Sequence, residues 1–212
     1  MTERDVIGIF GKMNSGKSSL MNLITQQETS IVDPTPGTTA DTKITLMEIH
    51  GLGPVKLMDT AGFDESDELG DKKRKKVIEA LKECDLVILI INPATTDFGQ
   101  EYLIINETRD LDKQLIVVYN LFQKEHLGKI EKVETALPDL KYFRKIISNV
   151  LDKESRKEII DFILNNYIPR NSEVELHPFV EKDEIYILNI TMDEETPPGR
   201  FLRPQSMAEE FI

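Results

Sequence analysis

An eight-residue segment near the N-terminus, Gly11–Ser18, reads GKMNSGKS and fits the pattern G-x-x-x-x-G-K-[ST]. The apolar run Val6–Phe10 precedes it, and residues 17–25 follow it with the spacing of an amphipathic helix. Glycines allow backbone N–H groups to curl around an anion, and the N-terminus of the helix faces that anion with its positive dipole end. The segment therefore predicts a phosphate site. The alternative is a glycine-rich turn between strand and helix that holds no ligand.

Each polar residue of this segment has an expected role. Lys17 is expected to reach the β- and γ-phosphates of a nucleotide as a point charge, and the hydroxyl of Ser18 is expected to bind Mg²⁺. The nucleotide contacts expected from this segment and the serine that follows it are Lys12, Met13, Asn14, Ser15, Gly16, Lys17, Ser18 and Ser19.

Two later segments complete the predicted phosphate and magnesium site. Asp59-Thr60-Ala61-Gly62 follows a strand, so Asp59 is expected to hold Mg²⁺ and the N–H of Gly62 to sense a γ-phosphate. Alone, such a D-x-x-G segment would be an ordinary turn. Thr39, in Pro36-Gly37-Thr38-Thr39, is expected to join the Mg²⁺ shell when the γ-phosphate is present, which makes an order-to-disorder switch plausible. Lys17, Thr39 and Gly62 are the expected catalytic groups.

Strands and helices alternate along most of the chain. The apolar periodicity predicts a hairpin of residues 42–49 and 55–58, a helix over residues 69–83 whose run Lys72–Lys76 is a solvated face, and a strand at Leu86–Ile91 covered on both faces. Further elements are expected at residues 100–111, 115–119, 142–147 and 153–167, with an irregular stretch between residues 120 and 141. This order predicts a three-layer α/β fold with a mostly parallel sheet.

The same patterns suggest where the first domain ends. Residues 1–168 are expected to form it, and residues 169–212 a linker followed by a short extension too small for its own core. Residues 181–204 are expected to pair with a second copy, because an isolated extended strand leaves backbone groups unpaired. The N-terminus lacks the basic and apolar regions of a signal peptide and no apolar run spans a membrane, so the expected compartment is the cytosol.

Charge and cysteine content narrow the function further. The 212 residues include 26 Lys and Arg against 38 Asp and Glu, a formal net charge of −12. Such a chain repels nucleic-acid phosphates over most of its surface, so nucleic acid is not an expected partner. Cys84 is the single cysteine and the three histidines are far apart in sequence, so neither a disulfide nor a zinc site is expected. Cys84 precedes a buried strand and is expected in the core.

The segments P-G-T-T and D-T-A-G resemble those of the translation-factor-related GTPases. Residues 59–65 with Glu68-Leu69-Gly70, together with residues 197–202 and Pro204-Gln205, resemble HydF, the [FeFe]-hydrogenase maturation GTPase. The resemblance implies GTP hydrolysis with hydrogenase-maturation partners and a tail that begins a dimerisation domain. It places Phe63 where other GTPases have a water-orienting glutamine, and it implies that Asn14 helps to hold K⁺ beside the phosphates. Alternatively, Asn14 merely tolerates a left-handed backbone.

The sequence departs from the resemblance in two places. The guanine-reading motif N-K-x-D is replaced by Asn120-Leu121-Phe122-Gln123, in which a neutral amide stands where a carboxylate would accept two hydrogen bonds. Asn120 is retained, and Ser148 stands where the backbone of the family's Ser-Ala touches the base, although a helix cap explains that serine equally well. HydF proteins also carry a cysteine-rich cluster domain, and no cysteine follows Cys84 here.

The expected function is therefore a Mg²⁺-dependent switch that binds GTP and GDP, hydrolyses GTP slowly and is stimulated by K⁺. The alternative is a non-catalytic protein, a scaffold module that binds nucleotide with a degenerate base site and hydrolyses little or no GTP. An ATPase is a third possibility, which rests only on the missing aspartate.

Overall fold

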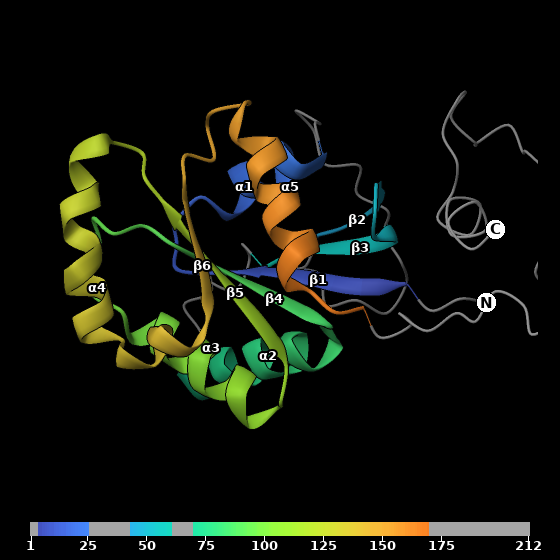
Figure 1. Ribbon diagram of the computed structural model, residues 1–212. Coiled ribbons are helices and arrows are strands. Elements are labelled where there is room, and N and C mark those ends of the chain that lie inside the picture. The colour runs from blue at the N-terminus through green and yellow to red at the C-terminus, as the bar shows by residue number, and fades with distance from the viewer. Residues whose placement is uncertain (1–3, 26–42, 61–69, 170–212) are drawn as a thin grey trace, which may run out of the picture.

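The computed structural model describes residues 4–25, 43–60 and 70–169, and all structural statements below concern these residues. They form a six-stranded sheet in the order β2-β3-β1-β4-β5-β6 (Figure 1). The strands are β1 (Asp5–Phe10), β2 (Lys43–Ile49), β3 (Gly53–Asp59), β4 (Leu86–Ile91), β5 (Gln114–Asn120) and β6 (Arg144–Ser148). Only β2 runs antiparallel to its neighbour, so the sheet is mostly parallel, as the sequence predicts.

The pairing of the strands follows their apolar pattern. β2 and β3 form the expected hairpin, with Ile44 opposite Met58 and Ile49 opposite Gly53. Every residue of β4 is buried, because this strand lies between β1 and β5 and helices cover both of its faces. A run without polar alternation thus marks the middle of the sheet.

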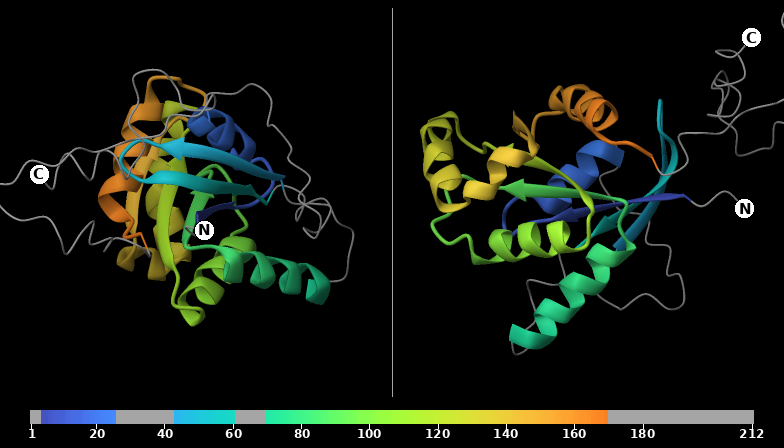
Figure 2. Two further views of the ribbon diagram at one scale, coloured as in Figure 1. Left: turned by 90° about the vertical axis from the view of Figure 1, so that its right-hand side faces the viewer. Right: turned by 60° about the horizontal axis from the view of Figure 1, so that its bottom comes forward.

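Helices cover both faces of the sheet (Figures 1 and 2). The helices α1 (Lys17–Thr25) and α5 (Ser155–Asn166) lie on one face, and α2 (Gly70–Glu83) and α3 (Gly99–Asp110) on the other. Each face has its own apolar cluster: Leu20 and Ile159 belong to the first, Leu81 and Ile104 to the second. The predicted three-layer α/β fold is confirmed.

The stretch between β5 and β6 is more ordered than the sequence analysis expected. It contains the helix α4 (Ile130–Ala136), flanked by the 3₁₀ helices η2 (Lys124–Lys129) and η3 (Pro138–Tyr142). Val133 of α4 is fully buried against the same cluster as α2 and α3. The apolar positions Ile130, Val133 and Leu137 have helical spacing and could have revealed α4, but the segment is too short for a strong periodic signal.

Three smaller expectations can also be compared with the structure. Cys84 is buried in the core as predicted, and its burial raises the pKa of the thiol to about 12. Arg74 and Lys75 of the basic run are exposed, and Arg74 pairs with Glu107 of α3. Among the described residues no helix is both long enough and apolar enough to cross a membrane. The tail expected to pair with a second copy lies outside the described residues.

Candidate functional site

The polar residues singled out in the sequence gather at one edge of the sheet. Gly11 follows β1, while Asp59, Asn120 and Ser148 are the last residues of β3, β5 and β6. These four strands run parallel, so their carboxyl ends meet at the same edge. In open α/β sheets, ligands bind in the crevice beyond these carboxyl ends.

The Gly11–Ser18 loop has a backbone that its sequence makes possible. Gly11 has φ +148° and Gly16 has φ +109°. A Cβ on Gly16 would lie 2.4 Å from Nδ2 of Asn120, and one on Gly11 would lie 2.3 Å from the carbonyl oxygen of Ile90. Both glycines are therefore required by conformation and by close approach. Asn14 adopts the left-handed region with φ +61°, as expected if it is present because asparagine tolerates this conformation.

Lys17 begins α1, and its side chain turns back into the loop. Its residue is only 5% exposed, and its Nζ donates to the carbonyl oxygens of Gly11 at 2.6 Å and Lys12 at 2.9 Å. The carbonyls thus solvate a buried ammonium group that would otherwise be costly. The positive charge is held at the centre of the loop, which is where the sequence predicts the phosphates.

Ser18 and Asp59 are brought together from α1 and β3. The hydroxyl of Ser18 donates to Oδ2 of Asp59 at 3.0 Å, and Asp59 is buried while Ser18 is open to solvent. Thr60 fixes the chain after β3 by donating its hydroxyl to the carbonyl oxygen of Ile9 at 2.7 Å. A hydroxyl and a carboxylate are hard oxygen ligands of the kind that Mg²⁺ prefers, so this pair fits a magnesium ion.

Asn120 ties the end of β5 to the loop. It is fully buried, its Nδ2 donates to the carbonyl oxygen of Ser15 at 2.8 Å, and its Oδ1 accepts from the backbone N–H of Val150 at 3.2 Å. Both ends of the amide are therefore used within the protein. In this structure Asn120 joins the phosphate loop to the segment that follows β6.

The remaining residues of the expected base site lie nearby. The N–H of Leu121 donates to the carbonyl oxygen of Ser148 at 2.8 Å, and the hydroxyl of Ser148 is buried without a hydrogen-bond partner among the described residues. Gln123 is exposed at the start of η2.

Ser19 is half-buried in the first turn of α1. Thr39, Gly62 and Phe63 lie outside the described residues.

The structure also brings three charged residues together that the sequence analysis did not single out as a group. Lys12 forms an ion pair with Asp97, with Nζ 2.7 Å from Oδ2, and this hydrogen bond holds the pKa of Asp97 below its usual value. Glu101, in the first turn of α3, is fully buried beside them. Its burial raises the pKa of its carboxyl group, and hydrogen bonding by the backbone N–H groups of Glu101 and Lys12 opposes that rise together with the charge of Lys12. In the sequence, Glu101 looks like an ordinary acidic residue of a first helical turn.

Comparison with known proteins agrees with this geometry. The sequence profile of the family described as "50S ribosome-binding GTPase" matches residues 6–121. GTPase Der of Nautilia profundicola is 35% identical over 128 residues, which are 60% of this chain and 27% of that protein. The tRNA modification GTPase MnmE of Lactobacillus acidophilus is 33% identical over 159 residues, which are 73% of this chain and 32% of that protein. The chain thus spans about a third or less of the length of these two relatives.

A solved structure gives the same fold. Era of Aquifex aeolicus, bound to GDP and AlF₄⁻, has a TM-score of 0.60 at 24% identity, over 89% of this chain and 63% of that one. The profile match covers more than half of the chain and includes the loop, Asp59 and Asn120. The chain therefore belongs to the P-loop GTPases of the TrmE/Era/Der type, and it contains a GTPase domain of that family.

Proposed function

We propose that this chain is a Mg²⁺-dependent GTP-binding domain that hydrolyses GTP slowly and works as a switch. The observation that carries the proposal is the buried ammonium group of Lys17, held inside a glycine-bounded loop at the N-terminus of α1. A buried cation surrounded by backbone groups matches an anionic ligand, since phosphate oxygens can replace the carbonyls of Gly11 and Lys12 as its partners.

Each residue has a defined task in this proposal. The loop's N–H groups and Lys17 bind and orient the phosphates. Ser18 and Asp59 would hold the magnesium ion, with Thr39 joining them, and the ion supplies positive charge against the phosphate oxygens when it is bound. The N–H of Gly62 would orient the γ-phosphate.

Base recognition is the weakest part of the proposed site. Gln123 offers one acceptor oxygen where a carboxylate would accept two hydrogen bonds from guanine. We expect calorimetric titration to give tighter binding of GTP and GDP than of ATP, with Gln123→Asp tightening GTP and GDP by about 10- to 100-fold because a hydrogen bond to a charged group contributes about 1.5–3 kcal/mol. ATP is the internal control and should be unaffected by the substitution.

Two results would contradict that expectation. If no nucleotide binds in the presence of Mg²⁺, the proposal of a GTP-dependent switch is wrong. If ATP binds as tightly as GTP and Gln123→Asp changes neither, Gln123 does not face the base and the guanine assignment fails.

The proposal includes stimulation by K⁺ through Asn14. Because Asn14 has φ +61°, Asn14→Gly removes the amide oxygen while it keeps the backbone conformation accessible. We expect phosphate release from GTP to be faster in KCl than in NaCl, and we expect Asn14→Gly to abolish this difference without weakening nucleotide binding. Equal rates in both salts would remove the K⁺ mechanism. Stimulation that survives in Asn14→Gly would leave Asn14 as a turn residue only.

We further propose that the whole protein serves [FeFe]-hydrogenase maturation, on the resemblance of residues 59–70 and 197–205 to HydF. Deletion of the gene in its host is then expected to abolish hydrogen evolution by the host's [FeFe]-hydrogenase, with recovery when the gene is restored. Unchanged hydrogen evolution in the deletion strain would refute this role and leave the GTPase proposal intact.

A further inference from the structure

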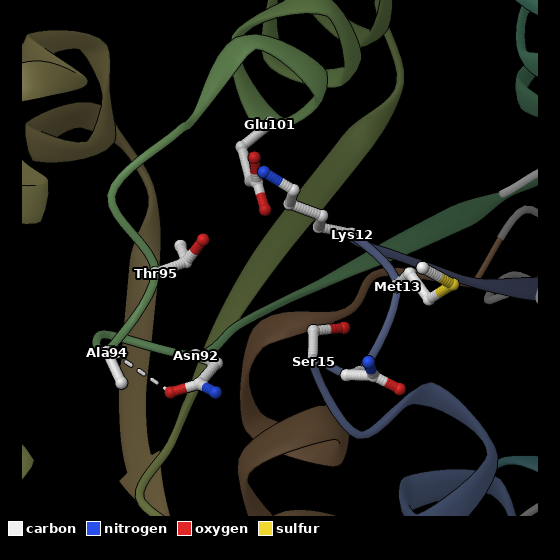
Figure 3. Close-up of a pocket in the computed structure, with 8 residues that line it drawn as sticks. Lys12, Met13, Ser15, Asn92, Ala94, Thr95 and Glu101 are labelled. Carbon is white, nitrogen blue, oxygen red and sulfur yellow. Dashed lines mark hydrogen bonds between the residues drawn. The ribbon is translucent and has the colours of Figure 1, made fainter.

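Of the acidic residues that the structure describes, Glu101 is the most deeply buried, with 0% of its surface exposed. It stands in the first turn of α3, and Figure 3 shows it facing Lys12 at one end of a pocket of about 230 Å³ that the phosphate loop also lines. Burial of a carboxylate is costly, and a negative charge beside a phosphate site also repels the ligand. An acid in this place therefore needs a compensating interaction.

The compensating interaction comes from the backbone of the loop. The N–H groups of Lys12 and of Glu101 itself act as hydrogen-bond donors to the Glu101 carboxylate, and together with the charge of Lys12 they lower the pKa that burial raises. The Lys12 side chain is engaged elsewhere, since its Nζ donates to Oδ2 of Asp97 at 2.7 Å and to the carbonyl oxygen of Asp97 at 3.2 Å. Glu101 thus acts on the loop through the backbone of Lys12.

The N–H of Lys12 belongs to the same peptide unit as the carbonyl group of Gly11. This peptide is trans, so its N–H and its C=O point in opposite directions. A carboxylate that accepts from the N–H on one side therefore fixes the direction of the carbonyl group on the other side. That carbonyl oxygen accepts from Nζ of Lys17 at 2.6 Å. A single peptide plane thus connects the buried acid to the buried ammonium group.

A second side chain of α3 acts on the same carbonyl group. Nε2 of Gln100 donates to the carbonyl oxygen of Gly11 at 3.4 Å. Together with Glu101, it brings the start of α3 against both loop residues whose carbonyl oxygens hold the Lys17 ammonium group. The first turn of α3 therefore supports the loop at the point where Lys17 is held.

We propose that Glu101 is a positioning residue of the phosphate loop: its carboxylate orients the Gly11–Lys12 peptide, and this peptide holds the Lys17 ammonium group in place before the phosphates arrive. The proposal rests on the function proposed above, because it concerns how that site is kept ready for its ligand. A loop that is already ordered lowers the cost of binding. The benefit of this order offsets the repulsion between the acid and the phosphates.

Two substitutions of Glu101 separate positioning from charge. Methionine suits a helix about as well as glutamate and has no acceptor oxygen, so Glu101→Met should weaken GTP binding by about 10-fold or more, because a hydrogen bond to a charged group is lost. Glu101→Gln keeps one acceptor oxygen for the N–H of Lys12 and should lose only roughly 2- to 5-fold. If Glu101 acted only through its charge, both variants would bind GTP more tightly, since a repulsive charge is removed.

Calorimetric titration with GTP and with GDP in the presence of Mg²⁺ measures these losses. We expect the same loss for both nucleotides, because the loop surrounds phosphates that they share. The matched control is Asp110→Asn, which removes an exposed acid at the far end of the same helix and should change neither affinity.

An amide spectrum of the ¹⁵N-labelled full chain without nucleotide tests the contact itself. An N–H that donates to a carboxylate is deshielded, so the Lys12 amide proton should resonate downfield in the wild type. It should move upfield in Glu101→Met and by less in Glu101→Gln. The rest of the spectrum verifies that each variant is folded, and if Glu101→Met fails to fold, Glu101→Gln carries the same test.

The outcomes distinguish this role from the function on which it rests. A wild type that binds no nucleotide would refute the proposed function, and this role with it. If the wild type binds GTP and the folded Glu101 variants bind it equally well or more tightly, only the positioning role is overturned. An unchanged Lys12 amide signal in the variants would also overturn it, since Glu101 would then not hold the peptide.

Discussion

Lys17→Ala is expected to weaken GTP binding by roughly 30- to 5,000-fold, because truncation of one member of a buried charge pair costs about 2–5 kcal/mol. The Lys17 ammonium group is already buried and placed inside the loop, so little ordering is needed when phosphates arrive. Removal of this group leaves the negative phosphates against two carbonyl oxygens. Calorimetric titration of the wild type and the variant with GTP in the presence of Mg²⁺ measures the loss.

The control for this variant separates charge at the site from charge in general. Lys56→Ala removes an exposed lysine from β3 and lowers the net charge by the same amount, so it should leave GTP affinity unchanged. Lys17→Ala also leaves the carbonyls of Gly11 and Lys12 without their donor, which is expected to cost about 1–3 kcal/mol of folding stability. Urea denaturation verifies that the variant is still folded at the titration temperature. Equal GTP affinity in a folded Lys17→Ala would refute the phosphate site.

Much of the fold could be predicted because burial on two faces leaves a clear pattern. The uninterrupted apolar run of β4 predicts a central strand, and the structure buries every one of its residues. The hairpin of β2 and β3 follows from a local turn and a short-range alternation. The helix α4 was missed because it has seven residues, of which only Val133 is buried, so its amphipathic signal is hardly longer than two turns.

The candidate site likewise contains residues that the sequence predicts and one that it does not. The positions that need a positive φ lie within one segment of eight residues, so the conformation of the loop can be predicted from that segment alone. The pairing of Ser18 with Asp59 joins residues 41 positions apart, and it was predictable because parallel strands place their carboxyl ends together. Glu101 was not predictable as a buried carboxylate, because nothing in its neighbourhood in the sequence says that a loop from residues 12–15 covers it.

Asn120 illustrates how one side chain can serve two parts of the site. Its place at the end of β5 predicts a role in base recognition, yet its amide bridges the carbonyl of Ser15 and the N–H of Val150. It therefore spans 105 residues in one direction and 30 in the other, within a buried environment. The end of β5 thus fixes where the phosphate loop lies relative to the segment after β6.

Asn120→Ala is expected to lower the free energy of unfolding by about 2–6 kcal/mol, because two buried backbone groups lose their partners at about 1–3 kcal/mol each. The same change should weaken GTP binding, since the loop loses the contact that holds Ser15 in place. Urea denaturation measures the first effect and calorimetric titration the second.

The matched control is Asn166→Ala at the end of α5, where the amide makes one local hydrogen bond to the carbonyl of Phe162 and a much smaller loss of stability is expected. A role of Asn120 in base binding and a role as a structural bridge predict different effects of this substitution. If its amide acts only on the base, Asn120→Ala weakens nucleotide binding and leaves stability without nucleotide unchanged. If it acts as the bridge that the hydrogen bonds describe, stability falls even in the apo chain, because Ser15 and Val150 lose their buried partner before any nucleotide binds.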